Sequence, residues 1–245
     1  MPADINAYES LMSDAIRHFW GARFQAAENQ RERGVEDQGN RSSVTAGKNL
    51  DGFTALIKQI IIDNGISETE VYTKGRKALT IPGFYRPTKN WDLLVVRRSR
   101  FLAAIELKSQ VGPSFGNNFN NRVEEALGNA TDLNIAFREG AFGESQKPFV
   151  GYFFVLEECS GSMSPVRYDS PYFPVLPEFE NTSYAARYEI FCRKLVQERL
   201  YDAAALVLTQ RSAVDTGEHR NLSDLTSARS FVSVLAGRIS SMMLD

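Results

Sequence analysis

The sequence predicts an α/β fold with a central mixed sheet flanked by helices. The first observation is a set of near-continuous apolar runs, which are typical of strands covered on both faces. These runs span 91–96, 101–108, 148–156 and 203–209. The second observation is that apolar residues elsewhere recur every three to four positions, as in amphipathic helices. The helices expected from this spacing span 5–27, 50–64, 121–138, 184–199 and 222–243.

The first half of the chain alternates between helical and β-rich sequence. A polar, glycine-containing stretch from Glu28 to Lys48 predicts a loop between the first two helices, and Gly65 marks the end of the second helix. The segment 71–109 is β-rich, with an irregular stretch at Pro82 and Gly83. Within it, Arg98-Ser99-Arg100 predicts a turn between two strands, so that 91–108 forms a hairpin.

The second half contains two segments that are expected to be irregular. Residues 111–121 are rich in glycine and asparagine and predict a loop before the helix at 121–138. Residues 159–183 hold four of the nine prolines and predict a long excursion. Aromatic residues of the excursion are expected to pack in the core or in a surface loop, although a recognition arm or a dimer contact is an alternative. These residues are Tyr168, Tyr172, Phe173 and Phe179.

Length and composition are those of a globular protein. With 245 residues and 43% hydrophobic residues, residues 1–245 are expected to form a single domain with a sizeable core. No apolar run approaches the roughly 20 residues that a membrane span needs, and the first thirty residues do not have the pattern of a signal peptide. Two cysteines, Cys159 and Cys192, do not indicate a disulfide framework. We therefore expect no membrane partner and a cytoplasmic location.

Charge and histidine content narrow the chemistry. The net charge is only −2, which argues against an indiscriminate nucleic-acid coat protein. Residues 71–110, however, carry nine basic side chains against two acidic ones, and this excess suits a specific phosphate-binding face as well as it suits a solvated surface. His18 and His219 are the only histidines of the sequence, so zinc clusters and histidine-based catalysis are disfavoured. Carboxylates and lysine are therefore the expected catalytic groups.

The hairpin brings two carboxylates and one lysine together. If the turn is centred on Ser99, Asp92 lies directly opposite Glu106, with Cβ atoms roughly 4.5–5.5 Å apart. Lys108 follows two residues after Glu106 and points to the same face. A register shift of one residue would separate the three side chains, so the expectation depends on the turn.

Facing carboxylates in a hydrophobic sheet repel each other unless a positive charge joins them. Mg²⁺ suits this role because it prefers oxygen ligands and keeps several waters. We expect Asp92, Glu106 and the carbonyl group of Leu107 to hold it, and Lys108 to stabilise a phosphate or to orient and deprotonate water. A plainer alternative is that Glu106 and Lys108 are residues at a strand end and that Asp92 is a cap.

An Asp on one strand followed by Glu-x-Lys on the next resembles the PD-(D/E)xK nucleases, although Trp91 replaces the proline of that pattern. The stretches PGFYRPTKNWD (82–92), IELKSQVGPSFGNN (105–118) and NNRVEEA (120–126) resemble the XhoI-type type II restriction endonucleases more specifically, over most of the chain. The resemblance implies a restriction-endonuclease-like core and a bacterial homodimer. It also implies Mg²⁺-dependent cleavage of double-stranded DNA at CTCGAG, after the first C, leaving four-base 5′ overhangs. Two alternatives stay open, namely a structure-selective or repair nuclease of the same superfamily and a DNA-binding module that does not cut.

Candidate DNA contacts flank the catalytic residues on both sides. Arginine and asparagine can bond guanine and adenine in the major groove, so the segment after the catalytic strand could read bases or clamp the backbone. The candidates there are Asn117, Asn118, Asn120, Asn121 and Arg122. Asparagines also favour loops and helix caps, which is the alternative for Asn121.

Other polar residues near the hairpin have less specific roles. Arg86 and Lys89 could hold phosphates or lie in a solvated loop. Glu124 and Glu125 could add a metal ligand, but their expected place at a helix start explains them equally well. Gly47-Lys48-Asn49 lacks the spacing of a phosphate-binding loop, so no nucleotide cofactor is expected.

Overall fold

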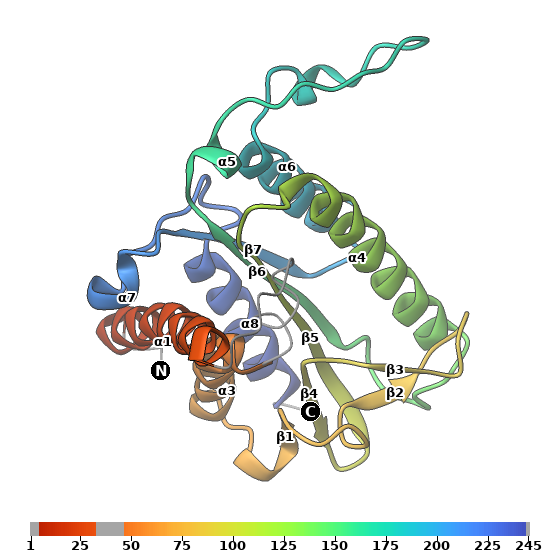
Figure 1. Cartoon of the computed structure of the whole chain (residues 1–245). Coiled ribbons are helices and arrows are strands. Elements are labelled where there is room, and N and C mark those ends of the chain that lie inside the picture. Colours follow the sequence, from red (N-terminus) through yellow and green to blue (C-terminus); the bar gives the residue numbers. More distant parts are fainter. Residues whose placement is uncertain (1–4, 33–46, 244–245) are drawn as a thin grey trace.

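The computed structural model describes residues 5–32 and 47–243, and it has a five-stranded mixed sheet between two layers of helices (Figure 1). The strand order is β1-β4-β5-β6-β7, and β2 and β3 form a separate two-stranded sheet. In the main sheet, β1, β4 and β5 pair antiparallel, whereas β5, β6 and β7 pair parallel. The strands are β1 (Val71–Tyr72), β2 (Thr80–Pro82), β3 (Thr88–Asn90), β4 (Leu93–Arg97), β5 (Arg100–Gln110), β6 (Phe149–Glu157) and β7 (Ala203–Thr209). The predicted fold class is therefore confirmed.

Helices cover both faces of the sheet, as the unbroken apolar strands require. The longer ones are α1 (Ile5–Glu32), α3 (Asp51–Asp63), α4 (Phe115–Arg138), α6 (Tyr184–Gln197) and α8 (Ala228–Met242). The shorter ones are η1 (Gly47–Leu50), η2 (Glu68–Glu70), α5 (Ser160–Met163), η3 (Pro177–Phe179) and α7 (Ala213–Thr216). No helix within the described ranges combines the length and apolar character that a membrane span would need.

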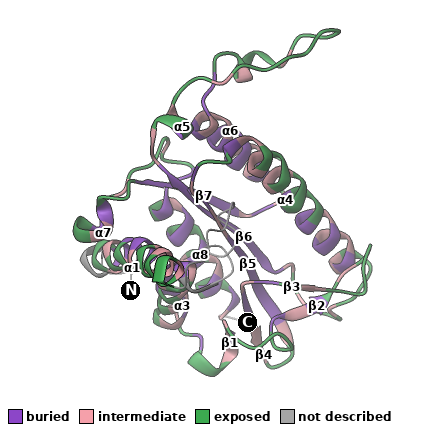
Figure 2. Ribbon diagram, in the orientation of Figure 1, coloured by how far each residue is buried: buried purple, intermediate pink, exposed green. Residues whose placement is uncertain are grey.

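Two hydrophobic cores lie on opposite faces of the sheet (Figure 2). Helices α1, α3 and α8 pack over one face, where Phe53 lies 5.4 Å from Phe153 between ring centroids. Helices α4 and α6 pack over the other, where Phe154 stacks on Tyr188 at 4.2 Å. Alternate residues of one strand therefore enter different cores, and β5 and β6 are buried along almost all of their length.

The start of α4 is a correction to the expected loop at 111–121. The helix begins at Phe115 rather than at 121, so the asparagine-rich segment forms its first turns. Phe115 is buried and stacks against Tyr184 at 6.0 Å between ring centroids. A Cβ atom at Gly116 would lie 2.7 Å from the Tyr184 hydroxyl, so glycine allows the helix to approach α6 closely. Packing against α6 thus outweighs the loop preference of glycine and asparagine.

Two other boundaries differ from the expected ones. Helix α8 begins at Ala228 rather than at 222, because the amide of Leu206 donates to the carbonyl oxygen of Thr226 and ties the preceding segment to β7. The Ser227 hydroxyl then caps the helix by accepting a hydrogen bond from the Ser230 amide. The loop expected at 28–48 is replaced by helix up to Glu32, and residues 33–46 lie outside the described ranges.

The expected excursion forms an extended arm (165–183) that projects from the body of the molecule (Figure 1). Its two legs are joined at the base by antiparallel bridging between Pro165 and Ser183. Tyr172 is 88% exposed and Phe173 is 79% exposed. Tyr168 is exposed as well, so the expectation that the aromatic residues pack in the core or a surface loop is wrong for Tyr168, Tyr172 and Phe173. Phe179 is half-buried, and its ring centroid lies 5.1 Å from Lys194 Nζ.

The hairpin between β4 and β5 turns through two residues, Arg98 and Ser99, which have φ angles of 47° and 63°. Left-handed backbone at both central positions is the geometry of a type I′ turn, which favours Asn-Gly. We therefore expect the double substitution Arg98→Asn and Ser99→Gly to raise the free energy of unfolding by about 1 kcal/mol, measured by urea denaturation. Glycine at the neighbouring strand residue, in Arg100→Gly, should instead lower it. Equal effects of the two changes would refute this account of the turn.

Candidate active site

The predicted hairpin register holds where the carboxylates lie. Leu93 pairs with Ile105, Leu94 with Ala104 and Val95 with Ala103, so the next step places Asp92 beside Glu106. The register has two causes, and the turn accounts for only one of them. The two-residue turn pairs Arg97 with Arg100, and a bulge at Val95/Val96 then shifts the pairing by one residue.

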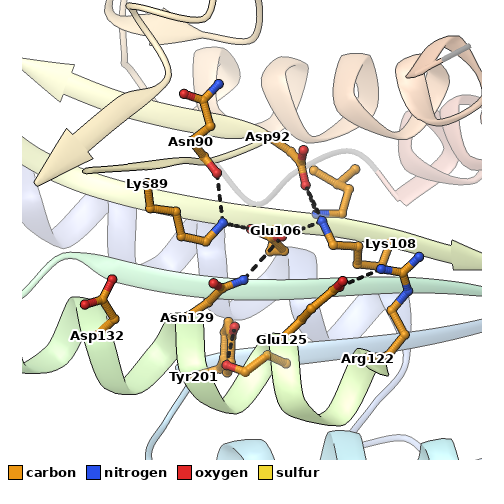
Figure 3. Close-up of polar contacts among 12 residues, drawn as sticks. Lys89, Asn90, Asp92, Glu106, Lys108, Arg122, Glu125, Asn129, Asp132 and Tyr201 are labelled. Carbon is orange, nitrogen blue, oxygen red and sulfur yellow. Dashed lines mark hydrogen bonds and ion pairs between the residues drawn. The ribbon is translucent and has the colours of Figure 1, made fainter. Parts of the chain in front are cut away.

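Asp92, Glu106 and Lys108 form one contact network (Figure 3). The Lys108 ammonium forms ion pairs with Glu106 Oε1 and, at 3.5 Å, with Asp92 Oδ2. The backbone amide of Leu107 donates to Asp92 Oδ2 at 2.8 Å. Because the N–H and C=O groups of one strand residue point to the same side, the Leu107 carbonyl oxygen faces the same edge of β5 as Asp92. The four predicted catalytic and metal-binding residues therefore converge.

Glu106 is the most deeply buried charge of this network. Its side chain is 4% exposed, and Lys89 on β3 donates to its Oε2 at 2.8 Å. Asn129 of α4 adds a longer contact of 3.5 Å from Nδ2 to Glu106 Oε1. A buried carboxylate is costly unless it is paired and hydrogen-bonded. Here two lysines, Lys89 and Lys108, compensate the charge.

Charges and burial set the protonation states of the network. Burial raises the pKa of Asp92, the neighbouring Glu106 raises it further, and Lys108 opposes the rise. Burial alone would also raise the pKa of Glu106, but Lys108 and Lys89 outweigh it and the pKa is lowered. Burial would lower the pKa of Lys108, but Glu106 and Asp92 outweigh it and the pKa is raised. Lys108 is therefore an ammonium at neutral pH, which suits contact with a phosphate better than proton abstraction.

A cleft of about 1220 Å³ opens in front of this network. Side chains of α4 that are three or four residues apart line one wall, so one face of the helix is turned to the cleft. They are Asn117, Asn118, Asn121, Arg122, Glu125 and Asn129. Asn120 and Glu124 do not line the cleft. Of the predicted DNA-contact residues on α4, Asn120 therefore does not face the cleft, whereas the others do.

The polar residues of α4 that line the cleft differ in their freedom to meet a ligand. Asn118 Nδ2 donates to the Ser114 carbonyl oxygen at 2.7 Å, within the first turn. Arg122 forms an ion pair with Glu125 at 2.6 Å. Asn117 and Asn121 are exposed. Since α4 begins at Phe115, neither a cap role for Asn121 nor a helix-start role for Glu124 and Glu125 holds.

Arg86 and Lys89 occupy positions that the sequence did not reveal. Arg86 donates from Nε to Asp132 at 2.8 Å and from Nη2 to Asn129 at 2.7 Å. Lys89 is 10% exposed, and it also donates to the Asn90 carbonyl oxygen and lies 4.5 Å from the Trp91 ring centroid. Arg86 thus lines the cleft and holds Asn129, whereas Lys89 belongs to the charged network itself.

Two further cleft residues were missed. Arg23 of α1 donates from Nη2 to the Ser109 hydroxyl at 3.0 Å and lies 4.6 Å from the Phe19 ring centroid. Burial lowers its pKa to about 10, so it stays charged at neutral pH. Asn129 links Glu106 to Arg86. Arg23 carried no local signal because it lies more than eighty residues before its partner, whereas the helical spacing from Arg122 and Glu125 could have identified Asn129.

The described residues provide oxygen ligands for a hard cation. Asp92, Glu106 and the Leu107 carbonyl group offer two carboxylates and one carbonyl oxygen within the network. Across the described part of the chain, there is no group of three or more His, Cys, Asp or Glu residues that could hold a metal. Mg²⁺ keeps waters and substrate phosphates among its ligands, so a site with few protein ligands suits Mg²⁺ better than a zinc-type cage would.

Comparison with known proteins gives the class of the molecule. Residues 29–221 match the sequence profile described as "Restriction endonuclease XhoI". The chain is 50% identical over 196 residues to the type II restriction enzyme XhoI of Xanthomonas vasicola, which covers 80% of this chain and 78% of that protein. It is 52% identical over 181 residues to the type II restriction enzyme BstVI of Geobacillus stearothermophilus, covering 72% and 80% of the two chains.

A third relative, the type II restriction enzyme AbrI of Azospirillum brasilense, is 49% identical over 173 residues, covering 71% of this chain and 77% of that protein. No solved structure matches the chain significantly. The protein is therefore a type II restriction endonuclease, that is, a site-specific deoxyribonuclease. It belongs to the restriction endonuclease XhoI family, because the family profile matches most of its length.

Asp132 of α4 organises the loop before Lys89. Its buried carboxylate accepts hydrogen bonds from the Phe84 amide, the Tyr85 amide and Arg86 Nε at 2.7–2.8 Å. Burial alone would raise the pKa of Asp132, but these hydrogen bonds outweigh it and lower the pKa. The carboxylate therefore stabilises the fold above the pKa of the unfolded chain, and the stabilisation is lost as pH falls through the lower folded pKa.

We expect Asp132→Asn to lower the free energy of unfolding by about 1.5–3 kcal/mol at pH 7, because charged hydrogen bonds are lost. The difference from the unsubstituted protein should shrink as pH falls below about 4, measured by urea unfolding across pH. Glu139→Gln is the control, since its pair with Arg138 is exposed and contributes little. A loss that is independent of pH would show that the carboxylate charge is not what stabilises the loop.

Proposed function

We propose that this enzyme hydrolyses double-stranded DNA with Mg²⁺ at CTCGAG, after the first C, and leaves four-base 5′ overhangs. The observation that carries the proposal is the network of Asp92, Glu106 and Lys108 at the cleft. The target sequence is what the resemblance to the XhoI-type enzymes implies. The identity of about half of the residues to three type II restriction enzymes supports the proposal.

The residues present fit a magnesium ion. Asp92 and Glu106 would hold it, with the Leu107 carbonyl group beside them. When bound, Mg²⁺ would polarise the phosphate and make a water molecule more acidic. The Asp92 side chain is 42% exposed, so this carboxylate is accessible from the cleft, whereas Glu106 forms the buried end of the site.

The chain's own side chains would position and stabilise the reacting phosphate. Lys108 is a charged donor between two carboxylates at the cleft, so it can donate to a phosphate oxygen as negative charge develops. Arg23 adds a second positive charge that lines the same cleft. Water adds to phosphorus, one P–O ester bond breaks, and the departing oxygen takes up a proton. Asn129 holds Glu106 in place for this step.

A homodimer would explain how both strands are cut. Each chain contributes one network of Asp92, Glu106 and Lys108, which serves one strand. A two-fold dimer presents two such networks to a palindrome in equivalent positions. We propose that hydrolysis uses no nucleotide cofactor, because Gly47-Lys48-Asn49 lacks the spacing of a phosphate-binding loop. We place the action in the bacterial cytoplasm, where the cell's DNA lies.

We expect purified protein to cut long linear DNA into discrete fragments that end at CTCGAG, with Mg²⁺ but not with EDTA. Lys108→Ala should lower the cleavage rate by about 100-fold or more while DNA binding persists, because one charge-stabilising donor is removed. Gel mapping of fragment ends and a DNA-binding assay measure the two effects. Preferential cutting of nicked or branched DNA would instead indicate a structure-selective nuclease, and Mg²⁺-independent binding without cutting would indicate a binding module.

The two faces of α4 allow a matched test of base reading. Asn121 lines the cleft and Asn120 does not, although both are exposed asparagines on the same helical turn. We expect Asn121→Ala to weaken specific DNA binding by about 1–3 kcal/mol and Asn120→Ala to leave it nearly unchanged. Fluorescence anisotropy with a CTCGAG duplex and a scrambled duplex measures this. Equal effects of the two substitutions would show that the face of α4 that carries Asn121 does not contact the bases of the target site.

A further inference from the structure

The charged network contains one more lysine than a pair of metal-binding carboxylates and the lysine of the Glu-x-Lys motif require. Asp92 and Glu106 contribute two negative charges, and Lys89 and Lys108 contribute two positive charges (Figure 3). Arg122 and Glu125 beside them are paired with each other and add no net charge. In the absence of a ligand the network is therefore neutral.

Lys89 reaches Glu106 from outside the main sheet. It lies on β3, which pairs only with β2 in the two-stranded sheet. Its ammonium donates to Glu106 Oε2 and to the Asn90 carbonyl oxygen, each at 2.8 Å, and faces the Trp91 ring. Three directions of the ammonium are thus satisfied within the protein.

Both carboxylate oxygens of Glu106 are occupied by this arrangement. Lys108 and Asn129 contact Oε1, and Lys89 contacts Oε2. A cation that binds Glu106 must therefore displace one lysine contact or share an oxygen with it. Asp92, Glu106 and Lys108 alone would form a network with a net negative charge, which would attract the cation. Lys89 makes the network neutral, so the attraction between the network and the cation is weaker.

We infer that Lys89 makes metal binding depend on DNA. Without DNA, the Lys89 ammonium is paired with the Glu106 carboxylate. A DNA phosphate in the cleft then pairs with Lys89 in place of Glu106 and leaves the carboxylate for the metal. A phosphate brings one negative charge to the network, so the metal then enters a site whose charge is favourable. Magnesium sites commonly combine one or two carboxylates with substrate phosphates, which fits this order. The inference rests on the proposed function, because it takes Asp92 and Glu106 as the metal ligands and DNA as the source of the phosphate.

The coupling is reciprocal. If bound DNA strengthens metal binding, then bound metal strengthens DNA binding by the same factor. A positive charge at position 89 strengthens this coupling, whereas an uncharged side chain of similar length does not strengthen it. Lys89 acts here as a positioning residue that regulates Glu106, and its role is separate from that of Lys108.

The test measures Mg²⁺ binding to the full chain without DNA. Isothermal titration calorimetry with magnesium chloride and EDTA-treated protein is expected to give at least about tenfold tighter binding for Lys89→Met than for the unsubstituted protein. Lys89→Arg keeps the charge and should bind Mg²⁺ as weakly as the unsubstituted protein. Lys77→Met is the matched control, because Lys77 is an exposed lysine of the same basic segment and should change nothing.

A second titration uses the same proteins saturated with a CTCGAG duplex that carries non-hydrolysable linkages at the cut positions. The duplex should tighten Mg²⁺ binding to the unsubstituted protein by a larger factor than to Lys89→Met. Unchanged, weaker or absent Mg²⁺ binding by DNA-free Lys89→Met would overturn the inference, because a purely supporting role of Lys89 predicts that result. The proposed cleavage is judged separately, by whether the unsubstituted protein cuts CTCGAG with Mg²⁺.

Discussion

The compensation of one buried carboxylate organises the candidate active site. The side chain of Glu106 enters the helix-covered face of β5, where only 4% of it is exposed, so its charge must be met mainly by the protein. Lys108 meets it from the same strand, Lys89 meets it from the small β2–β3 sheet, and Asn129 meets it from α4. Three separate parts of the chain are thus held at one point by one charge.

Helix α4 connects this charged network to the cleft. Its inner residues, such as Phe115 and Ala126, pack into the core between the sheet and α6. Its outer residues carry amides and charges along the cleft wall. Asp132, near its C-terminal end, fixes the loop that precedes Lys89. The helix that completes the hydrophobic layer therefore also forms one wall of the cleft in front of Glu106.

The sequence predicted those parts of the fold that depend on local patterns. The continuous apolar strands and the three-to-four spacing of the helices were sufficient for the layers. The pairing of Asp92 with Glu106 was predicted from a turn centred on Ser99, but the chain reaches it through a two-residue turn and a bulge. Local propensity failed at 115–121, because the stacking of Phe115 on Tyr184 is a tertiary contact. The aromatic residues of the arm were expected to pack, but the chain leaves Tyr172 in solvent.

Site residues were predictable only where neighbours in the sequence are also neighbours in space. Asp92, Glu106 and Lys108 share one hairpin; strand parity sufficed to place Glu106 and Lys108 on one face, whereas the position of Asp92 also depends on the bulge. Lys89 was identified as a basic residue before the hairpin, yet its contact with Glu106 depends on how β3 folds back over β5. Arg23 comes from α1, and no periodicity of α1 indicates that its end reaches Ser109.

The bulge between β4 and β5 bears on how this enzyme can change in evolution. The alignment of Asp92 with Glu106 is the result of a two-residue turn plus one extra residue, Leu102, on β5. Gain or loss of a single residue in either place would turn one strand's side chains to the opposite face and separate the carboxylates. Length variation in this hairpin is therefore restricted to compensating pairs, whereas the arm, which joins no two strands of the main sheet in register, can vary in length one residue at a time.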